Sequence, residues 1–194
     1  MECGLDGGAA GVRRDGRARE VAGAVRGEEE DHLGDLARGG EPAQLGGLGE
    51  LLLLAVIEHQ TEAVLGMQES LFVDLDSMAG LRRWRDALVE YQRRLQCRGG
   101  CPIGSLGSEV AETNPEARLA VASGFLRWEA AIRDGLRAMH ARGELDSDPE
   151  DLALATLAAL QGGLLLTQLQ REVRPLEVAL DSVLDHIESH VKGP

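Results

Sequence analysis

From residue 50 onward, apolar residues recur every three or four positions, and polar residues occupy most of the places between them. This is the spacing by which an amphipathic α-helix buries one face. Interruptions divide the pattern into five stretches, and each stretch predicts one long helix. The predicted helices span residues 50–72, 77–97, 115–142, 149–170 and 174–191.

Residues typical of helix ends mark the borders of these stretches. Asp76-Ser77, Asn114-Pro115 and Asp148-Pro149 each supply a side chain that can cap a helix, and two of them add a proline suited to the first turn. Gly143 is suited to the end of the third helix. Residues 98–113 hold four glycines and a proline, and we interpret them as a break between helices. The predicted fold is all-α, with five or six long helices.

The fourth predicted helix carries no charged residue from Leu152 to Gln170. Polar residues interrupt this run, which favours a helix buried between protein surfaces over a membrane span. One amphipathic neighbour cannot cover so apolar a helix, so we expect the last two helices to form a symmetric four-helix interface in a homodimer. The residues assigned to that interface are Leu157, Leu160, Gly162, Gly163, Leu164, Leu180, Val183, Leu184 and Ile187.

Composition separates the first part of the chain from the rest. The 194 residues include 20 Lys and Arg against 33 Asp and Glu, a formal net charge of −13. So acidic a chain is a poor candidate for a stand-alone nucleic-acid binder, because such proteins present a basic surface to phosphates. Residues 1–50 hold 13 of the 25 glycines, and the first Thr, Ser and aromatic residue come only after residue 60. We therefore divide the chain into an atypical Gly/Ala/Arg/Glu-rich segment, residues 1–46, and a helical domain, residues 47–194.

Aromatic residues are scarce, and most of them flank the glycine-containing break. Four of the five lie on the second and third predicted helices. Pockets for small molecules are mostly apolar with a few polar groups, so these helices predict a cavity for a small apolar ligand. Plain core packing is the alternative for each residue. The residues assigned to ligand binding are Trp84, Leu88, Tyr91, Cys101, Phe125, Trp128 and Ile132.

The remaining reactive side chains give weaker signals. Cys97 and Cys101 suggest an alternative thiol or redox function, because Arg98 would favour a thiolate. His186 and His190 have a spacing that can hold a metal, but no further ligand pattern accompanies them, so we predict no metal and no other cofactor. No catalytic motif is recognisable, and we predict that the protein is not an enzyme. A purely structural dimer without a ligand is a second alternative.

Two further expectations concern the surroundings of the protein. The chain does not open with a signal-peptide pattern, and three cysteines are too few for a disulfide scaffold, so we expect a cytoplasmic protein that binds no membrane. The arginines of the second predicted helix alternate with acidic residues, and we interpret them as a solvated face.

Five short motifs give the chain a family resemblance over about residues 50–191. They are Leu52-Leu53-Leu54-Ala55-Val56, Gly100-Cys101-Pro102-Ile103-Gly104-Ser105-Leu106, Gly143-Glu144-Leu145 with Asp148-Pro149, Leu160-Gln161-Gly162-Gly163-Leu164-Leu165-Leu166 and Arg174-Pro175-Leu176. In this order they resemble the effector-binding half of TetR-type transcriptional repressors, in the branch with a Gly-Cys-Pro-x-Gly-Ser segment. The resemblance implies a dimer through the last two helices and an effector pocket among the middle helices.

The first 46 residues depart from that family. Its members begin with a DNA-binding helix-turn-helix that uses Ser or Thr caps, aromatic residues and a lysine, none of which occurs here before residue 57. The acidic block Glu28-Glu29-Glu30-Asp31 would also repel phosphate. We hypothesise that this segment is not a working DNA-binding head, and is disordered or results from a change of reading frame near codons 46–51. A naturally shortened regulator is the alternative. No DNA-binding residue is assigned, and a DNA operator is expected as a partner only if an intact head exists.

Overall fold

The computed structural model describes residues 42–192, with side chains from residue 47 onward. The chain separates into two units, residues 1–48 and 49–194, and the description below concerns the second. Its described part is all-α, which confirms the predicted fold class. The helices are α2 (Pro42–Gly66), α3 (Glu69–Phe72), α4 (Met78–Arg94), α5 (Pro102–Val110), α6 (Pro115–Ala141), α7 (Pro149–Gln170) and α8 (Arg174–Ser189).

The predicted caps form as the sequence indicates. The Ser77 hydroxyl accepts a hydrogen bond from the Gly80 amide at 3.1 Å and begins α4. Asn114 accepts from the Ala117 amide at 2.9 Å and begins α6, and Asp148 caps α7 in the same manner. Each bond satisfies an amide that the first turn of a helix leaves without a partner.

The observed helices differ from the prediction in several places. Helix α2 begins at Pro42 rather than at residue 50, and α4 ends at Arg94 rather than at residue 97. The first helix ends at Gly66, and the short α3 follows, because the Gln68 amide bonds the Leu65 carbonyl in a tight turn at 3.0 Å. Residues 98–113 also contain a helix, α5, where we expected only a break. Cys101 caps it by accepting a bond from the Gly104 amide at 3.4 Å, and Pro102 occupies the first turn. The glycines obscured this helix in the sequence, because they lower helix propensity without preventing a helix whose apolar side packs on a core.

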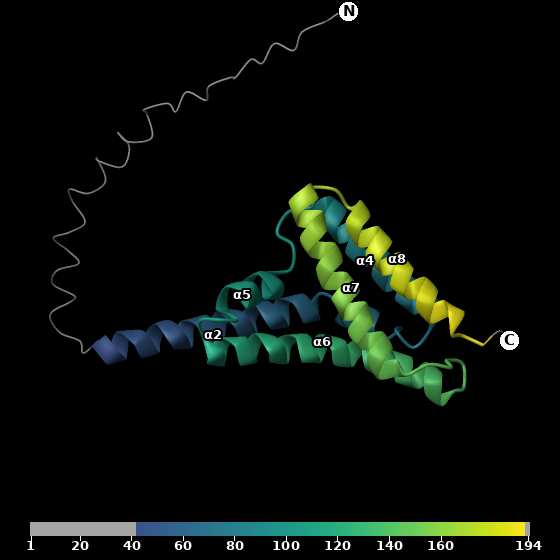
Figure 1. Cartoon of the computed structure of the whole chain (residues 1–194), viewed down its shortest axis with the longest axis horizontal. Coiled ribbons are helices and arrows are strands. Elements are labelled where there is room, and N and C mark those ends of the chain that lie inside the picture. The colour runs from purple at the N-terminus through teal and green to yellow at the C-terminus, as the bar shows by residue number, and fades with distance from the viewer. Residues whose placement is uncertain (1–41, 193–194) are drawn as a thin grey trace, which may run out of the picture. The chain divides into compact units, whose positions relative to one another are not determined.

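Helix α7 lies against α8 and α6 (Figure 1). Gly163 permits the close approach of α7 to α8, since a Cβ atom there would lie 3.0 Å from the Leu176 Cα. Among the described helices, α7 alone is long and apolar enough to cross a membrane, judged by length and composition. Of its most apolar stretch, 44% is buried inside the protein.

Helix α4 is held against α8 by a row of ion pairs. Arg85 bonds Asp181 at 2.7 Å, Arg93 bonds Glu177 at 2.5 Å, and Arg82 bonds Asp185 at 3.1 Å. The interpretation of these arginines as a solvated face was therefore wrong for Arg85, whose side chain is 17% exposed. It holds in part for Arg82 and Arg93, whose side chains are 40% and 52% exposed although they pair with α8. Sequence spacing could not reveal the pairing, because the partners lie about 84 to 103 positions further along the chain.

Helix α6 crosses the segments before α4 at two glycines. A Cβ atom at Gly124 would lie 2.8 Å from the Thr61 hydroxyl oxygen of α2, and one at Gly135 would lie 2.5 Å from the Leu75 carbonyl oxygen. These close approaches place α2 and the turn between α3 and α4 against α6. The space that remains between α2, α4 and α6 contains the site described next.

Candidate ligand-binding site

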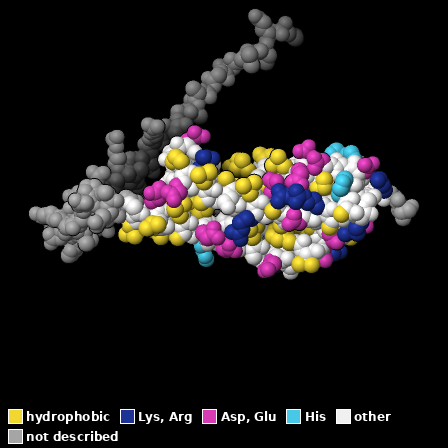
Figure 2. All heavy atoms as spheres, turned by 90° about the horizontal axis from the view of Figure 1, so that it is seen from below, with side chains coloured by type: hydrophobic (Ala, Val, Ile, Leu, Met, Phe, Trp, Pro, Cys, Tyr) yellow, Lys and Arg dark blue, Asp and Glu magenta, His cyan; other side chains and the backbone are white. Residues whose placement is uncertain are grey.

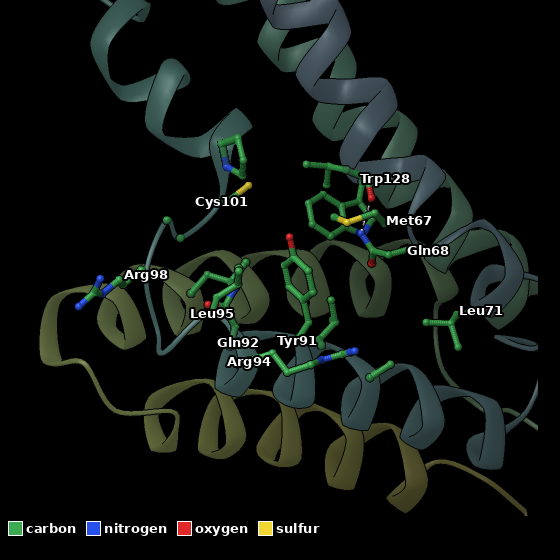
Figure 3. Close-up of a pocket in the computed structure, with 17 residues that line it drawn as sticks. Met67, Gln68, Leu71, Tyr91, Gln92, Arg94, Leu95, Arg98, Cys101 and Trp128 are labelled. Carbon is green, nitrogen blue, oxygen red and sulfur yellow. Dashed lines mark hydrogen bonds between the residues drawn. The ribbon is translucent and has the colours of Figure 1, made fainter.

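A cavity of about 580 Å³ lies between the C-terminal end of α2, the C-terminal half of α4 and the segment that leads into α5. Figure 3 shows its labelled residues converging from these elements, with Trp128 of α6 closing one side. Its volume falls within the range of small-molecule sites in proteins. Its apolar wall includes Val64, Met67, Leu71, Ala87, Leu88, Leu95, Pro102 and Leu164.

The structure brings together four of the seven residues assigned to ligand binding. Leu88, Tyr91, Cys101 and Trp128 all line the cavity. Phe125 lies instead beside a second hollow of about 390 Å³, which Cys101 also lines.

Trp84 and Ile132 do not line the cavity. Both are completely buried in the core. The Trp84 indole lies one layer behind the cavity wall and donates a hydrogen bond to the Gln68 side-chain oxygen at 2.9 Å. Gln68 itself lines the cavity, so Trp84 supports a wall residue rather than facing the space. Helical spacing places all these residues on inward faces, but it cannot tell which inward side chains meet each other and which border a gap.

Several polar residues of the wall were missed by the sequence reasoning. They are Gln68, Gln92, Arg94 and Arg98. Gln92 carried a detectable signal, because it follows Leu88 by four positions and therefore falls on the apolar stripe of α4. A glutamine at such a position is buried, and here it is 3% exposed.

The charge of the cavity wall differs from that of the rest of the domain. Two arginines and no acidic residue line the cavity. Residues 51–194 as a whole carry 14 basic against 22 acidic residues. Both Arg94 and Arg98 are exposed, so their charge lies at the solvent side of the cavity.

The surroundings of the cysteines disfavour thiol chemistry. Cys97 and Cys101 are both buried, and both sulfurs are free thiols. Burial raises the pKa of the Cys101 thiol above its usual value, and the hydrogen bond from the Gly104 amide opposes this only in part. A reactive thiol needs the opposite shift. Cys101 instead fixes the start of α5 beside the cavity.

Within residues 42–192, no three His, Cys, Asp or Glu side chains are grouped closely enough to hold a metal ion. The rings of His186 and His190 pack edge to face, with their centroids 4.9 Å apart.

The residues assigned to the dimer interface lie mostly inside one protomer. Seven of the nine are buried within the single chain: Leu157, Leu160, Gly163, Leu164, Leu180, Leu184 and Ile187. Val183 is half-buried, and Gly162 is exposed. The large apolar residues that α7 and α8 leave exposed are Leu154, Leu165, Leu166, Leu169 and Val178.

The exposed leucines of α7 form a continuous stripe. Leu154, Leu165 and Leu169, together with Ala158 and Gly162, recur at steps of three or four and therefore share one side of the helix. Single exposed hydrophobic side chains are common, and Figure 2 shows several among charged groups on the face that it draws. A stripe along a whole helix is less common, and we name these five residues the α7 stripe. The stripe belongs to the same uncharged run of residues that suggested a dimer interface in the sequence. It lies on a different side of α7 from the buried residues first assigned to that interface.

Similarity to known proteins agrees with this architecture. Residues 77–183 match the family described as Tetracyclin repressor-like, C-terminal domain. The transcriptional regulator AcuR of Cereibacter sphaeroides is 30% identical over 127 residues, which are 63% of this chain and 58% of AcuR. The chain thus spans less than two thirds of the length of that relative.

Two crystal structures share the fold. A regulatory protein TetR from Rhodobacter sphaeroides has a TM-score of 0.63 and 28% identity, covering 69% of this chain and 73% of that protein. A TetR transcriptional regulator from Chloroflexus aurantiacus has a TM-score of 0.61 and 28% identity, covering 73% of each chain. The sequence resemblance is thereby confirmed.

Proposed function

This chain belongs to the tetracyclin repressor-like C-terminal domain family, and from that premise we propose that it is a TetR-like transcriptional regulator whose helical domain binds a small, largely apolar effector and dimerises. The cavity carries the effector part of this proposal. It is large enough for a small molecule, mostly apolar, and bordered by four of the residues that the sequence assigned to a ligand. No feature of the described residues favours an enzymatic role over this one.

The position of the cavity also supports a regulatory role. Val64 lies in the last turn of α2, and Met67, Gln68 and Leu71 follow that helix directly. A ligand that fills the space contacts both the end of α2 and α4. Helix α2 leads back along the chain into residues 1–48. A ligand that prefers one position of α2 shifts the population toward that position, and this is the change that a regulator needs to transmit.

The dimer part of the proposal rests on the α7 stripe. Its leucines leave apolar area exposed along one helix, and Gly162 in its middle permits close approach of a second helix. A Cβ atom added at Gly162 would meet no other atom of the protomer within 4 Å, so packing within the chain does not require a glycine here. A two-fold pairing of α7 with its copy covers the stripe on both chains at once.

Binding of an apolar fluorescent probe tests the cavity. N-phenyl-1-naphthylamine is expected to brighten with the full-length protein, and Leu88→Trp, which fills the cavity, is expected to abolish the response. Leu126→Trp adds the same side chain at an exposed position of α6 and is expected to leave binding intact. Equal probe binding by the parent and Leu88→Trp, or none by the parent, would contradict an effector cavity and favour the purely structural dimer.

The DNA-binding part concerns residues outside those the structure describes. We propose that residues 1–46 of this chain do not form a working head, which extends the reading-frame hypothesis above. Translating the gene upstream of codon 51 in all three frames tests the cause, and a gel shift on the upstream DNA at low salt tests the consequence. Specific binding by this chain would overturn the proposal.

A further inference from the structure

The turn between α4 and α5, residues 95–101, borders both the cavity and α7. Five of its seven residues line the cavity, and Figure 3 labels three of them: Leu95, Arg98, Gly99, Gly100 and Cys101. Cys101 also lines the second hollow, whose other residues include Gly162 and Leu165 of the α7 stripe. The α4–α5 turn therefore has the cavity on one side and, across the second hollow, the proposed dimer face on another.

Two contacts hold the α4–α5 turn against the C-terminal end of α7. The Arg171 guanidinium donates a hydrogen bond to the Cys97 carbonyl at 3.0 Å. Gly100 lies so close to α7 that a Cβ atom there would collide with the Gln168 side chain. Both partners on α7 lie within two positions of Leu169, the last residue of the α7 stripe. A shift of the turn therefore changes contacts made by the part of α7 that carries the stripe.

The backbone of the α4–α5 turn is held in conformations that an isolated chain rarely adopts. Gln96 and Cys97 have φ angles of 53° and 55°, in the left-handed region that is uncommon for residues other than glycine. Gly99 and Gly100 follow with φ angles of 87° and 57°. Such conformations persist only where the surroundings maintain them, and they are frequent in segments that switch between arrangements. The bond from Arg171 shows that α7 supplies part of this restraint.

A ligand in the cavity adds a second restraint on the same turn. It packs against the cavity side of Gly99, Gly100 and Cys101 and limits their movement into that space. This favours the arrangement in which the turn contacts α7. Ordering that the ligand has already imposed on the turn and on α7 does not have to be imposed again when a second chain packs on the α7 stripe, so the two events favour each other.

We propose that the α4–α5 turn couples the cavity to the α7 stripe, so that a ligand in the cavity tightens the dimer. By linkage, dimerisation tightens ligand binding by the same factor. Coupling between two sites typically amounts to about 5–150-fold in affinity, and we expect at least about fivefold here. The coupling rests on the proposed function, because it links the effector cavity and the dimer interface that the function requires.

Sedimentation equilibrium of the full-length protein, with and without saturating N-phenyl-1-naphthylamine, measures the coupling. The probe is expected to lower the dimer Kd at least about fivefold. The same factor should appear in the probe Kd when it is measured far above and far below the dimer Kd. In Leu88→Trp, whose cavity is filled, the probe should leave the dimer Kd within about twofold, which assigns the effect to the cavity.

Two variants test the turn itself. Arg171→Ala removes the bond to the Cys97 carbonyl and is expected to reduce the effect of the probe on the dimer Kd to within about twofold, although the probe still binds. Arg118→Ala is the matched control, because it removes the same charge from an exposed position of α6, and the full coupling should remain. Gln168→Ala removes the side chain that Gly100 contacts, with the same expected loss, and keeps the test valid if Arg171→Ala does not fold.

The outcomes separate this inference from the proposed function. A parent protein that binds the probe with an unchanged or weakened dimer would overturn the coupling and leave the effector cavity standing. Coupling that persists in both Arg171→Ala and Gln168→Ala would overturn the role of the α4–α5 turn. If the parent binds no probe or forms no dimer, the proposed function fails, and this inference fails with it.

Discussion

Replacing Leu165 with glutamate tests whether the α7 stripe forms the proposed dimer interface. Leu165 lies near the middle of the stripe and is 55% exposed in the protomer. A glutamate there can reach water in a monomer. In a two-fold dimer, the substitution places two carboxylates inside an apolar contact.

The expected loss follows from the exposed area. Complete burial of a leucine contributes about 1.5–3 kcal/mol, so covering the exposed half of Leu165 contributes roughly 1 kcal/mol per chain. Each dimer loses this twice. Desolvating a polar group without a partner costs about 1–3 kcal/mol more, and a charged group costs more than that. The substitution should weaken the dimer by at least about 3 kcal/mol, or more than about a hundredfold in Kd. The protomer itself should change in stability by about 0.5 kcal/mol or less, as is usual at exposed positions.

Sedimentation equilibrium over a concentration series measures the dimer Kd, and thermal unfolding measures the protomer. Leu126→Glu is the matched control, since Leu126 is 60% exposed on α6 and lies outside the stripe. It should leave the dimer Kd within about threefold. Leu160→Ala, at a position completely buried in the protomer, should lower protomer stability by about 2–5 kcal/mol. If Leu165→Glu and Leu126→Glu leave the dimer equally intact, the stripe is not the interface.

Three further predictions concern the framework of the site. Gly135→Ala should destabilise the fold by about 1–3 kcal/mol in chemical denaturation, because the new Cβ would lie 2.5 Å from the Leu75 carbonyl oxygen. Asp181→Asn should cost about 0.5–1 kcal/mol through its 2.7 Å bond to Arg85, and 1 M salt should reduce the difference. Cys101 should react with iodoacetamide at pH 7 much more slowly than a free cysteine does, because burial raises its pKa and the thiolate becomes abundant only at higher pH.

Each of these has a control within the chain. Gly49→Ala lies in α2 with no atom within 4 Å of the new Cβ, so it should be neutral or stabilising by up to about 1 kcal/mol. Asp86→Asn removes the same charge from an Arg85 partner that is 70% exposed, and it should cost less than Asp181→Asn. Peptide mapping in a Cys3→Ser background reports the labelling of Cys101, and labelling as fast as that of free cysteine would revive the thiol alternative.

The sequence determined where three helices of this protein begin, because local chemistry sets those borders. Apolar spacing and the side chains of Ser77, Asn114 and Asp148 specify where α4, α6 and α7 begin, and each cap is made within three residues of itself. The family resemblance also rested on short local motifs. Helix α5 escaped prediction because its stability depends on burying Ile103 and Val110 against other elements, which its glycine content conceals.

Only the tertiary structure decided which apolar faces are interior and which remain exposed. A helix apolar nearly all round gives no periodic signal to mark the side that packs inside the chain, and α7 is such a helix. The structure places Leu160 and Leu164 inside and Leu165 and Leu169 outside, and so moves the proposed interface around the helix. The same holds for the cavity, because a gap arises where α2, α4 and α6 fail to meet, and no spacing within one helix records the distance to another. The partners of the α4 arginines on α8 follow from that packing.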